Sequence, residues 1–177
     1  MKRKRKINLK VSSKIFNKVY IPYLKDNTPT QIFYGGSSSG KSVFLAQRTV
    51  LDLMAGGRNY LVVRNVAKTL RGSAYNEIVK AITDMNLNKY FTITKSEMTI
   101  TCFNGYQILF CGLDDPEKIK SITPAKGIIT DIWIEEATEI EYNAYKQLTK
   151  RLRGRSRVVK RVTMSFNPIL KDHWIYD

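Results

Sequence analysis

One stretch of the chain, residues 35–42, has the residue types and the spacing needed to bind a polyphosphate. It reads GGSSSGKS and fits the pattern G-x-x-x-x-G-K-[ST] at every fixed position. Glycines let the backbone wrap a phosphate chain, and successive N–H groups point at its oxygens. Lys41 is expected to reach the β- and γ-phosphates and to act in catalysis, while the Ser42 hydroxyl is expected to ligate Mg²⁺. The predicted contacts of ATP are Gly35, Gly36, Ser37, Ser38, Ser39, Gly40, Lys41 and Ser42.

Two adjacent carboxylates follow a predicted apolar strand, residues 128–134. Such a strand end is the second half of an ATP-hydrolysing site. Because side chains alternate along a strand, we place the end of the strand between the two residues. Glu135 is then assigned to the metal and Glu136 to the attacking water. The alternative is a junction in which both carboxylates only favour the N-terminus of the next helix.

Two further segments carry polar side chains that could reach a bound nucleotide. Ser165 and Asn167 lie at the end of the last predicted strand, residues 158–166, and parallel sheets bind ligands at the carboxyl ends of their strands. Gln31 precedes the glycine loop and could hydrogen-bond the edge of a base. Aromatic residues upstream could contact the base, with packing in the core as the competing interpretation; they are Phe16, Tyr20 and Tyr23.

The elements predicted around the glycine loop form a β-α-β unit. Residues 30–34 read as a buried strand that enters the loop, and residues 42–54 carry apolar residues at helical spacing. A second strand is predicted over residues 59–64. A Gly/Ser-rich turn that fits the pattern by chance is the alternative, and this flanking strand and helix argue against it. Upstream, residues 11–23 predict a short helix that is broken by Pro22.

The middle of the chain changes its hydrophobic period. A helix is predicted over residues 69–85, and residues 90–113 then alternate between apolar and polar positions, as in a β-meander. Asn104-Gly105 predicts a two-residue turn between the last two strands of this meander. A loop and short helix are expected near residues 112–118, and an amphipathic helix over residues 140–153.

Composition indicates one domain of an ordinary globular protein. The chain has 177 residues, 43% of them hydrophobic, and no apolar run approaches the roughly 20 residues that span a bilayer. Its net charge of +15 suggests a polyanionic partner such as nucleic acid, with solvated surface charge as the alternative. Cys102 and Cys111 lack the spacing of a zinc site. Residues 1–10 are expected to be a flexible basic arm, and His173 to be structural.

Together these segments resemble the ATPase domain of the large terminase subunit, the DNA-packaging motor of tailed phages. The glycine loop alone specifies only a superfamily, whereas an acidic strand end combined with SFNP-x-x-x-x-HW is much more specific. The matching segments cover nearly the whole chain and are GGSSSGKS at 35–42, LVVRNVAKTLRGSAYNEI at 61–78, GLDDPEKIKSI at 112–122, IWIEEATEI at 132–140 and SFNPILKDHW at 165–174.

The resemblance implies a P-loop NTPase of the RecA-like (ASCE) type. This fold is an α/β class, three-layer α/β/α sandwich whose central sheet is mostly parallel, with an additional strand between the P-loop strand and the acidic strand. The antiparallel meander would extend this sheet. The resemblance also assigns Glu135 to the metal, Glu136 to catalysis, and Ser165 and Asn167 to coupling loss of the γ-phosphate to movement.

Two departures from the family pattern affect these expectations. Many members carry an arginine inside the P-loop, where this chain has serines, so a trans-acting cation is expected from elsewhere. The candidates for that role, or for DNA contacts, are Lys118, Lys120, Lys126, Arg151, Arg153 and Arg155. The family also carries a lid subdomain and a C-terminal nuclease domain, so we expect residues 11–177 to be the ATPase domain of a longer protein.

The function implied by the resemblance is Mg²⁺-dependent ATP hydrolysis that moves double-stranded DNA into a procapsid. The implied partners are DNA, a portal protein, a small terminase subunit and further copies of the chain in a ring. The isolated chain is expected to be a monomer, and no interaction with a membrane is expected. The implied location is the host cytoplasm, at the procapsid portal. A helicase or RecA-like DNA-handling ATPase is one alternative, and a DNA-binding module that holds nucleotide without hydrolysing it is another.

Overall fold

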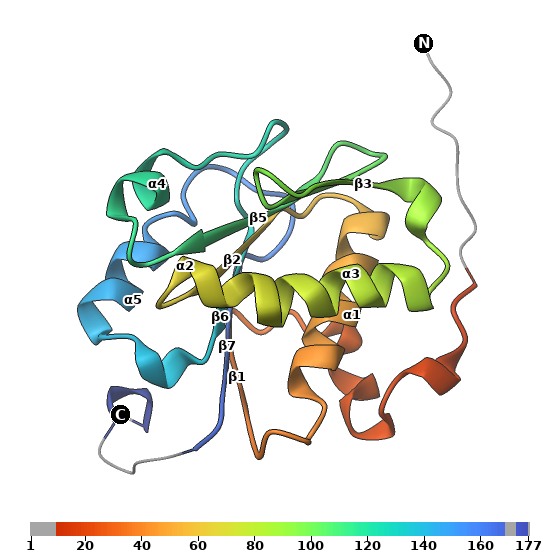
Figure 1. Cartoon of the computed structure of the whole chain (residues 1–177), viewed down its shortest axis with the longest axis horizontal. Coiled ribbons are helices and arrows are strands. Elements are labelled where there is room, and N and C mark those ends of the chain that lie inside the picture. The colour runs from red at the N-terminus through yellow and green to blue at the C-terminus, as the bar shows by residue number, and fades with distance from the viewer. Residues whose placement is uncertain (1–9, 169–172, 177) are drawn as a thin grey trace.

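The computed structural model describes residues 10–168 and 173–176, and its centre is a seven-stranded sheet (Figure 1). The strand order is β1-β7-β6-β2-β5-β4-β3. The bounds of the strands are β1 (Thr30–Tyr34), β2 (Tyr60–Arg64), β3 (Phe91–Thr94), β4 (Thr99–Cys102), β5 (Gln107–Gly112), β6 (Asp131–Glu135) and β7 (Arg161–Phe166). The predicted arm, residues 1–10, lies outside the described residues except for Lys10.

Helices cover both faces of the sheet. Within the described residues the α-helices are α1 (Lys41–Ala55), α2 (Ala67–Leu70), α3 (Asn76–Asp84), α4 (Pro116–Ser121) and α5 (Tyr142–Thr149). Figure 1 shows α1 and α3 together on one side of the strands and α4 and α5 on the other. None of the helices in this part of the chain is long and apolar enough to cross a bilayer.

The two faces bury separate hydrophobic cores, as expected of a three-layer α/β/α sandwich. One core contains Phe44 of α1, Ile78 of α3 and Trp133 of β6. The other contains Ile134 of β6 and Leu148 of α5. Because both faces are covered, β2 and β6 are nearly continuous apolar runs. The edge strand β1 alternates between buried and exposed positions, and β7 buries polar residues between its apolar ones.

Five strands are parallel, and their order confirms the predicted fold. β1 pairs with β7, β7 with β6, β6 with β2, and β2 with β5, all in parallel. β7 therefore separates the strand that enters the glycine loop from the strand that ends in the carboxylates. Since all five strands run the same way, their carboxyl ends meet at one edge of the sheet.

The meander is present, but its last turn is longer than predicted. β4 pairs antiparallel with both β3 and β5. The backbone N–H of Cys102 donates to the carbonyl of Tyr106 (2.8 Å), so residues 103–105 form a three-residue loop. Gly105 has φ of 87°, as the left-handed position of such a loop requires.

Two predicted helices differ from the structure. The helix expected over residues 69–85 is interrupted between α2 and α3 by a π-turn, Arg71–Tyr75, in which Ser73 has non-helical φ and ψ of −120° and −109°. Pro22 lies inside a 3₁₀-helix, Lys18–Lys25, and does not end it. The remaining 3₁₀ segments of the described chain are Ser13–Ile15, Asn88–Tyr90, Ala137–Glu139 and Trp174–Tyr176.

A buried ionic cluster fixes the opposite edge of the sheet. The carboxylate of Asp131, the first residue of β6, accepts from Arg58 Nη1 (3.0 Å) and from Arg161 Nε (2.6 Å). Arg161 also pairs with Asp52 near the end of α1. Buried charges are tolerated only when paired, so these contacts lock the starts of β6 and β7 to α1.

Candidate active site

The glycine loop connects β1 to the N-terminus of α1, as the sequence predicts. Gly40 caps α1 with φ of 81°, in the left-handed region that favours glycine. The first backbone N–H groups of this 15-residue helix face the loop without helical partners, and a helix N-terminus attracts anions. Ser37 and Ser38 are exposed, whereas Ser42 lies half-buried in the first helical turn.

Lys41 is buried at the centre of the loop, with 6% of its surface exposed. Its Nζ donates to the carbonyl oxygens of Gly35 (2.7 Å) and Gly36 (3.0 Å) and to Asn167 Oδ1 (3.1 Å). A further contact reaches Ser39 Oγ (3.1 Å). Burial lowers the pKa of Lys41, and the charge of Glu136 acts in the opposite direction.

The acidic strand ends where the sequence predicts. β6 stops at Glu135, and Glu136 adopts a left-handed conformation with φ of 49° and ψ of 54°. The side chain of Glu135 therefore follows the direction set by the strand, whereas that of Glu136 is set by the turn after it. Glu135 is 5% exposed, whereas Glu136 is half-buried and its charge acts on Lys41.

Glu135 is held by Ser73, a residue to which the sequence analysis assigned no role. Ser73 Oγ donates to Glu135 Oε2 (2.6 Å). Burial raises the pKa of Glu135, and the hydrogen bond from Ser73 and the charge of Arg64 partly oppose that rise. Arg64 itself ends β2 and forms two hydrogen bonds with Glu139 (2.8 and 3.1 Å).

Asn167 and Ser165, predicted to act together, lie in different surroundings. Asn167 follows β7 and bonds the P-loop lysine. Ser165 is buried inside β7, opposite Glu135 in the strand register, and its Oγ accepts from Trp133 Nε1 (3.0 Å). The structure thus brings Asn167 to the loop, whereas the arrangement of Ser165 does not support direct contact with a γ-phosphate.

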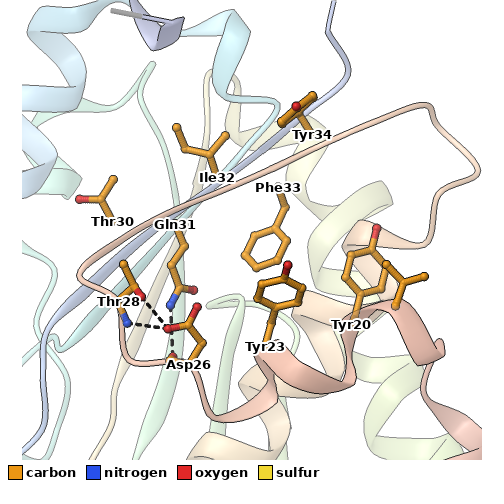
Figure 2. Close-up of a pocket in the computed structure, with 10 residues that line it drawn as sticks. Tyr20, Tyr23, Asp26, Thr28, Thr30, Gln31, Ile32, Phe33 and Tyr34 are labelled. Carbon is orange, nitrogen blue, oxygen red and sulfur yellow. Dashed lines mark hydrogen bonds between the residues drawn. The ribbon is translucent and has the colours of Figure 1, made fainter.

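Gln31 does not present its amide to a ligand, which corrects the prediction that it reads a base. Its Oε1 accepts from Arg48 Nη1 (2.5 Å), and its Nε2 donates to the carbonyl of Asp26 (3.1 Å). Figure 2 shows Gln31 directed toward Asp26, away from Ile32 and Tyr34. The physical reason is strand alternation, because Gln31 lies on the buried face of β1.

A cavity of about 350 Å³ lies beside β1 (Figure 2). Tyr20 and Tyr23 line it together with Phe33. Tyr20 stacks on Phe44 of α1 at 4.8 Å between ring centroids, and its hydroxyl donates to the carbonyl of Ser39 in the glycine loop (3.1 Å). Tyr20 therefore both packs against α1 and supports the loop, whereas Tyr23 packs edge-on against Phe33 of β1.

The six candidate basic residues have no hydrogen bond to residues 35–42 within the described chain. Arg151 donates to the carbonyls of Lys120 (2.9 Å) and Ile122 (2.6 Å), which ties the end of α5 to α4. Lys120 also pairs with Glu117 (2.9 Å). Lys126 donates to the carbonyl of Asn104 (2.6 Å). The exposed members of the set are Lys118, Lys120, Lys126, Arg153 and Arg155.

The oxygen groups at this edge of the sheet fit a magnesium ion that is shared with a nucleotide. Mg²⁺ is usually held by one or two carboxylates together with substrate phosphates and water. The Ser42 hydroxyl and the Glu135 carboxylate are donors of that kind, and Ser73 already fixes one oxygen of Glu135. No group of three or more His, Cys, Asp or Glu side chains that could hold a metal occurs in residues 10–168 and 173–176.

A family model and a curated relative that match this chain carry the same description. A family model described as phage terminase large subunit matches residues 27–177. The PBSX phage terminase large subunit of Bacillus subtilis (strain 168) is 34% identical over 146 residues, which are 82% of this chain and 33% of that protein. The chain therefore spans about a third of the length of this curated relative.

Solved structures show the same fold at low sequence identity. A large terminase from a thermophilic bacteriophage superposes with a TM-score of 0.67 at 15% identity, covering 86% of this chain and 37% of that chain. A structure of the same terminase in complex with ATP-gamma-S gives a TM-score of 0.61 at 16% identity, covering 86% of this chain and 36% of that chain.

Proposed function

This chain belongs to the phage terminase large subunit family, and we propose that it hydrolyses ATP to move double-stranded DNA into a procapsid. The observation that carries the proposal is the meeting of three predicted groups at one sheet edge. Lys41 of the glycine loop bonds Asn167 after β7, and Glu136 directly follows β6, the parallel strand next to β7. The nucleotide complex of the thermophilic phage terminase, which has the same fold, supports the choice of ATP.

Each residue at this edge of the sheet is proposed to have a separate role in ATP hydrolysis. Backbone N–H groups of residues 35–42 bind the phosphates, and the Lys41 ammonium leaves its carbonyl partners to contact the β- and γ-phosphates. Mg²⁺, held by Ser42 and Glu135, would neutralise charge on the phosphate oxygens. Glu136 orients the attacking water and accepts its proton. Asn167, released from Lys41, reports the state of the γ-phosphate.

The partners proposed for the assembled motor are DNA, a portal protein, a small terminase subunit and further copies of this chain in a ring. The net charge of +15 supports a polyanionic partner. The glycine loop, residues 35–42, carries no cation besides Lys41, and Arg64 near Glu135 is paired with Glu139, which supports a trans-acting residue from a neighbouring copy. The proposed location is the host cytoplasm at the procapsid portal.

Two substitutions test the catalytic assignment. Lys41→Ala should abolish ATP binding, because it removes the loop's only ammonium. Glu136→Gln should retain ATP binding but reduce turnover at least about 100-fold, as expected for loss of a general base. Binding is measured with a fluorescent ATP analogue, and turnover as phosphate release with and without DNA.

Glu141→Gln is the matched control, because Glu141 is an exposed carboxylate five residues further on whose side chain caps nothing. It should keep wild-type turnover. If Glu136→Gln turned over ATP at the wild-type rate, the catalytic assignment would be wrong. A wild-type chain that bound ATP and never hydrolysed it, even with DNA and partner subunits, would favour a non-hydrolysing module.

A further inference from the structure

The break between α2 and α3 lies next to the proposed metal site. Ser73 has φ and ψ outside the helical range in the middle of the π-turn, while α3 resumes at Asn76. Single π-turns inside α-helices are rare and occur often at functional sites. The apolar spacing around the break is regular, since Leu70, Ala74 and Ile78 are all buried. Core packing alone therefore gives no reason for the break.

The hydroxyl of Ser73 has one proton and three acceptors within reach. Glu135 Oε2 lies at 2.6 Å, the carbonyl of Thr69 at 2.9 Å and that of Leu70 at 3.5 Å. A hydroxyl donates one hydrogen bond, and a carboxylate is the strongest acceptor of the three. The short distance agrees with donation to Glu135.

The hydrogen bond from Ser73 connects the broken turn to a side chain 62 positions away in the sequence. A carboxylate held in this way has a fixed orientation.

We propose that Ser73 is a positioning residue for Glu135, and that the π-turn exists to bring its hydroxyl to that carboxylate. Ser73 binds Oε2 and leaves Oε1 available to a divalent cation. Groups that orient a metal ligand commonly change metal affinity 10- to 100-fold when they are removed. This inference rests on the proposed function, because Glu135 needs a fixed orientation only if it ligates Mg²⁺.

A purely structural role makes a different prediction. If Ser73 only satisfied the Thr69 carbonyl at the broken helix, its removal would lower stability and leave cation affinity unchanged. The readout that separates the two roles is therefore the affinity for Mn²⁺, a paramagnetic substitute for Mg²⁺, in the complex with a non-hydrolysable ATP analogue. Free Mn²⁺ is followed by electron paramagnetic resonance, and stability by thermal unfolding.

Three substitutions and one control make the experiment decisive. Ser73→Ala should weaken Mn²⁺ binding by about tenfold or more. Ser73→Thr keeps the hydroxyl and should restore affinity to within about threefold, whereas Ser73→Cys, a weak donor of similar size, should not. The control is Thr83→Ala on α3, which removes a comparable hydroxyl bonded to the carbonyl of Val79 (3.2 Å), and it should bind Mn²⁺ like the wild type.

Wild-type Mn²⁺ affinity in Ser73→Ala overturns the inference while leaving the proposed function intact. If Ser73→Ala does not fold, equal affinities in Ser73→Thr and Ser73→Cys overturn it instead. If the wild-type chain itself binds no Mn²⁺ with the nucleotide, the proposed function fails, and the inference fails with it.

Discussion

Glu136 combines an unusual backbone conformation with the role proposed for its side chain. A left-handed conformation strains most residues by roughly 1–2 kcal/mol, and asparagine tolerates it better than glutamate. The conformation turns the chain directly after β6, so that Glu136 does not follow the alternation of the strand. The strain is therefore tied to the position that the carboxylate must occupy.

Replacing Glu136 by asparagine should separate stability from activity. The free energy of unfolding of Glu136→Asn should equal that of the wild type or exceed it by up to about 1 kcal/mol, while ATP turnover is lost. Urea unfolding and phosphate release measure the two quantities. Asn86 offers the converse test, because it is exposed and has φ of 56°. Asn86→Glu should lower stability by a similar amount, and a loss of more than about 1 kcal/mol in Glu136→Asn would contradict the strain argument.

At the same scale, the sequence predicted the positions of residues that sit in local patterns. Lys41 and Ser42 begin the helix after the loop and Glu135 ends its strand, as expected, because a loop or a strand end sets these positions; their catalytic roles stay predictions. The role of Ser73 was not predicted, because its partner is distant in the sequence. Gln31 was assigned wrongly, since pattern alone does not say which face of an edge strand is buried.

Among the elements, the starts of β6 and β7 depend most on a single side chain. Asp131→Asn would leave Arg58 without a carboxylate partner and Arg161 with Asp52 alone, in a buried cluster. Breaking such a cluster should cost about 3–5 kcal/mol in the free energy of unfolding. Urea unfolding measures the loss.

Glu117→Gln on α4 is the control for this prediction. Its ion pair with Lys120 has both side chains largely exposed (85% and 72%), so the change should stay within about 0.5 kcal/mol of the wild type. Equal small losses in both variants would show that the cluster does not hold the strands in place.

The interrupted helix shows where element prediction stops. The apolar spacing from Leu70 to Ile82 continues across the π-turn, so periodicity favours one helix. The break depends on a tertiary contact, and no local signal reports it. The meander turn differs for a smaller reason, because Asn104-Gly105 fixes the presence of a turn but not the number of residues in its loop.

For the whole molecule, the charge predicts how DNA binding responds to salt. If the chain neutralises phosphates, its affinity for double-stranded DNA should fall steeply with salt, linearly in a plot of log K against log salt. Five of the positive charges lie in residues 2–6. Removing residues 1–9 should therefore reduce the slope if the predicted arm contacts DNA. Fluorescence anisotropy of labelled DNA, measured from about 50 to about 200 mM salt, gives both slopes. An affinity that did not change with salt would argue against DNA as the polyanionic partner.

The strand order is the whole-molecule feature that periodicity could not supply. Spacing predicted each parallel strand, but the expectation of an additional strand between the P-loop strand and the acidic strand came from the family resemblance. The register shows that this strand is β7. Strand order depends on long-range packing and is not encoded in any one segment.

The contacts of Lys41 connect two parts of the chain that lie 126 positions apart. Its ammonium has three protons, and in this structure they serve the loop carbonyls and Asn167. A nucleotide can recruit this ammonium only by taking it from those partners. Binding of phosphate by this ammonium would therefore also release Asn167, so that occupation of the glycine loop and the position of the residue after β7 are coupled.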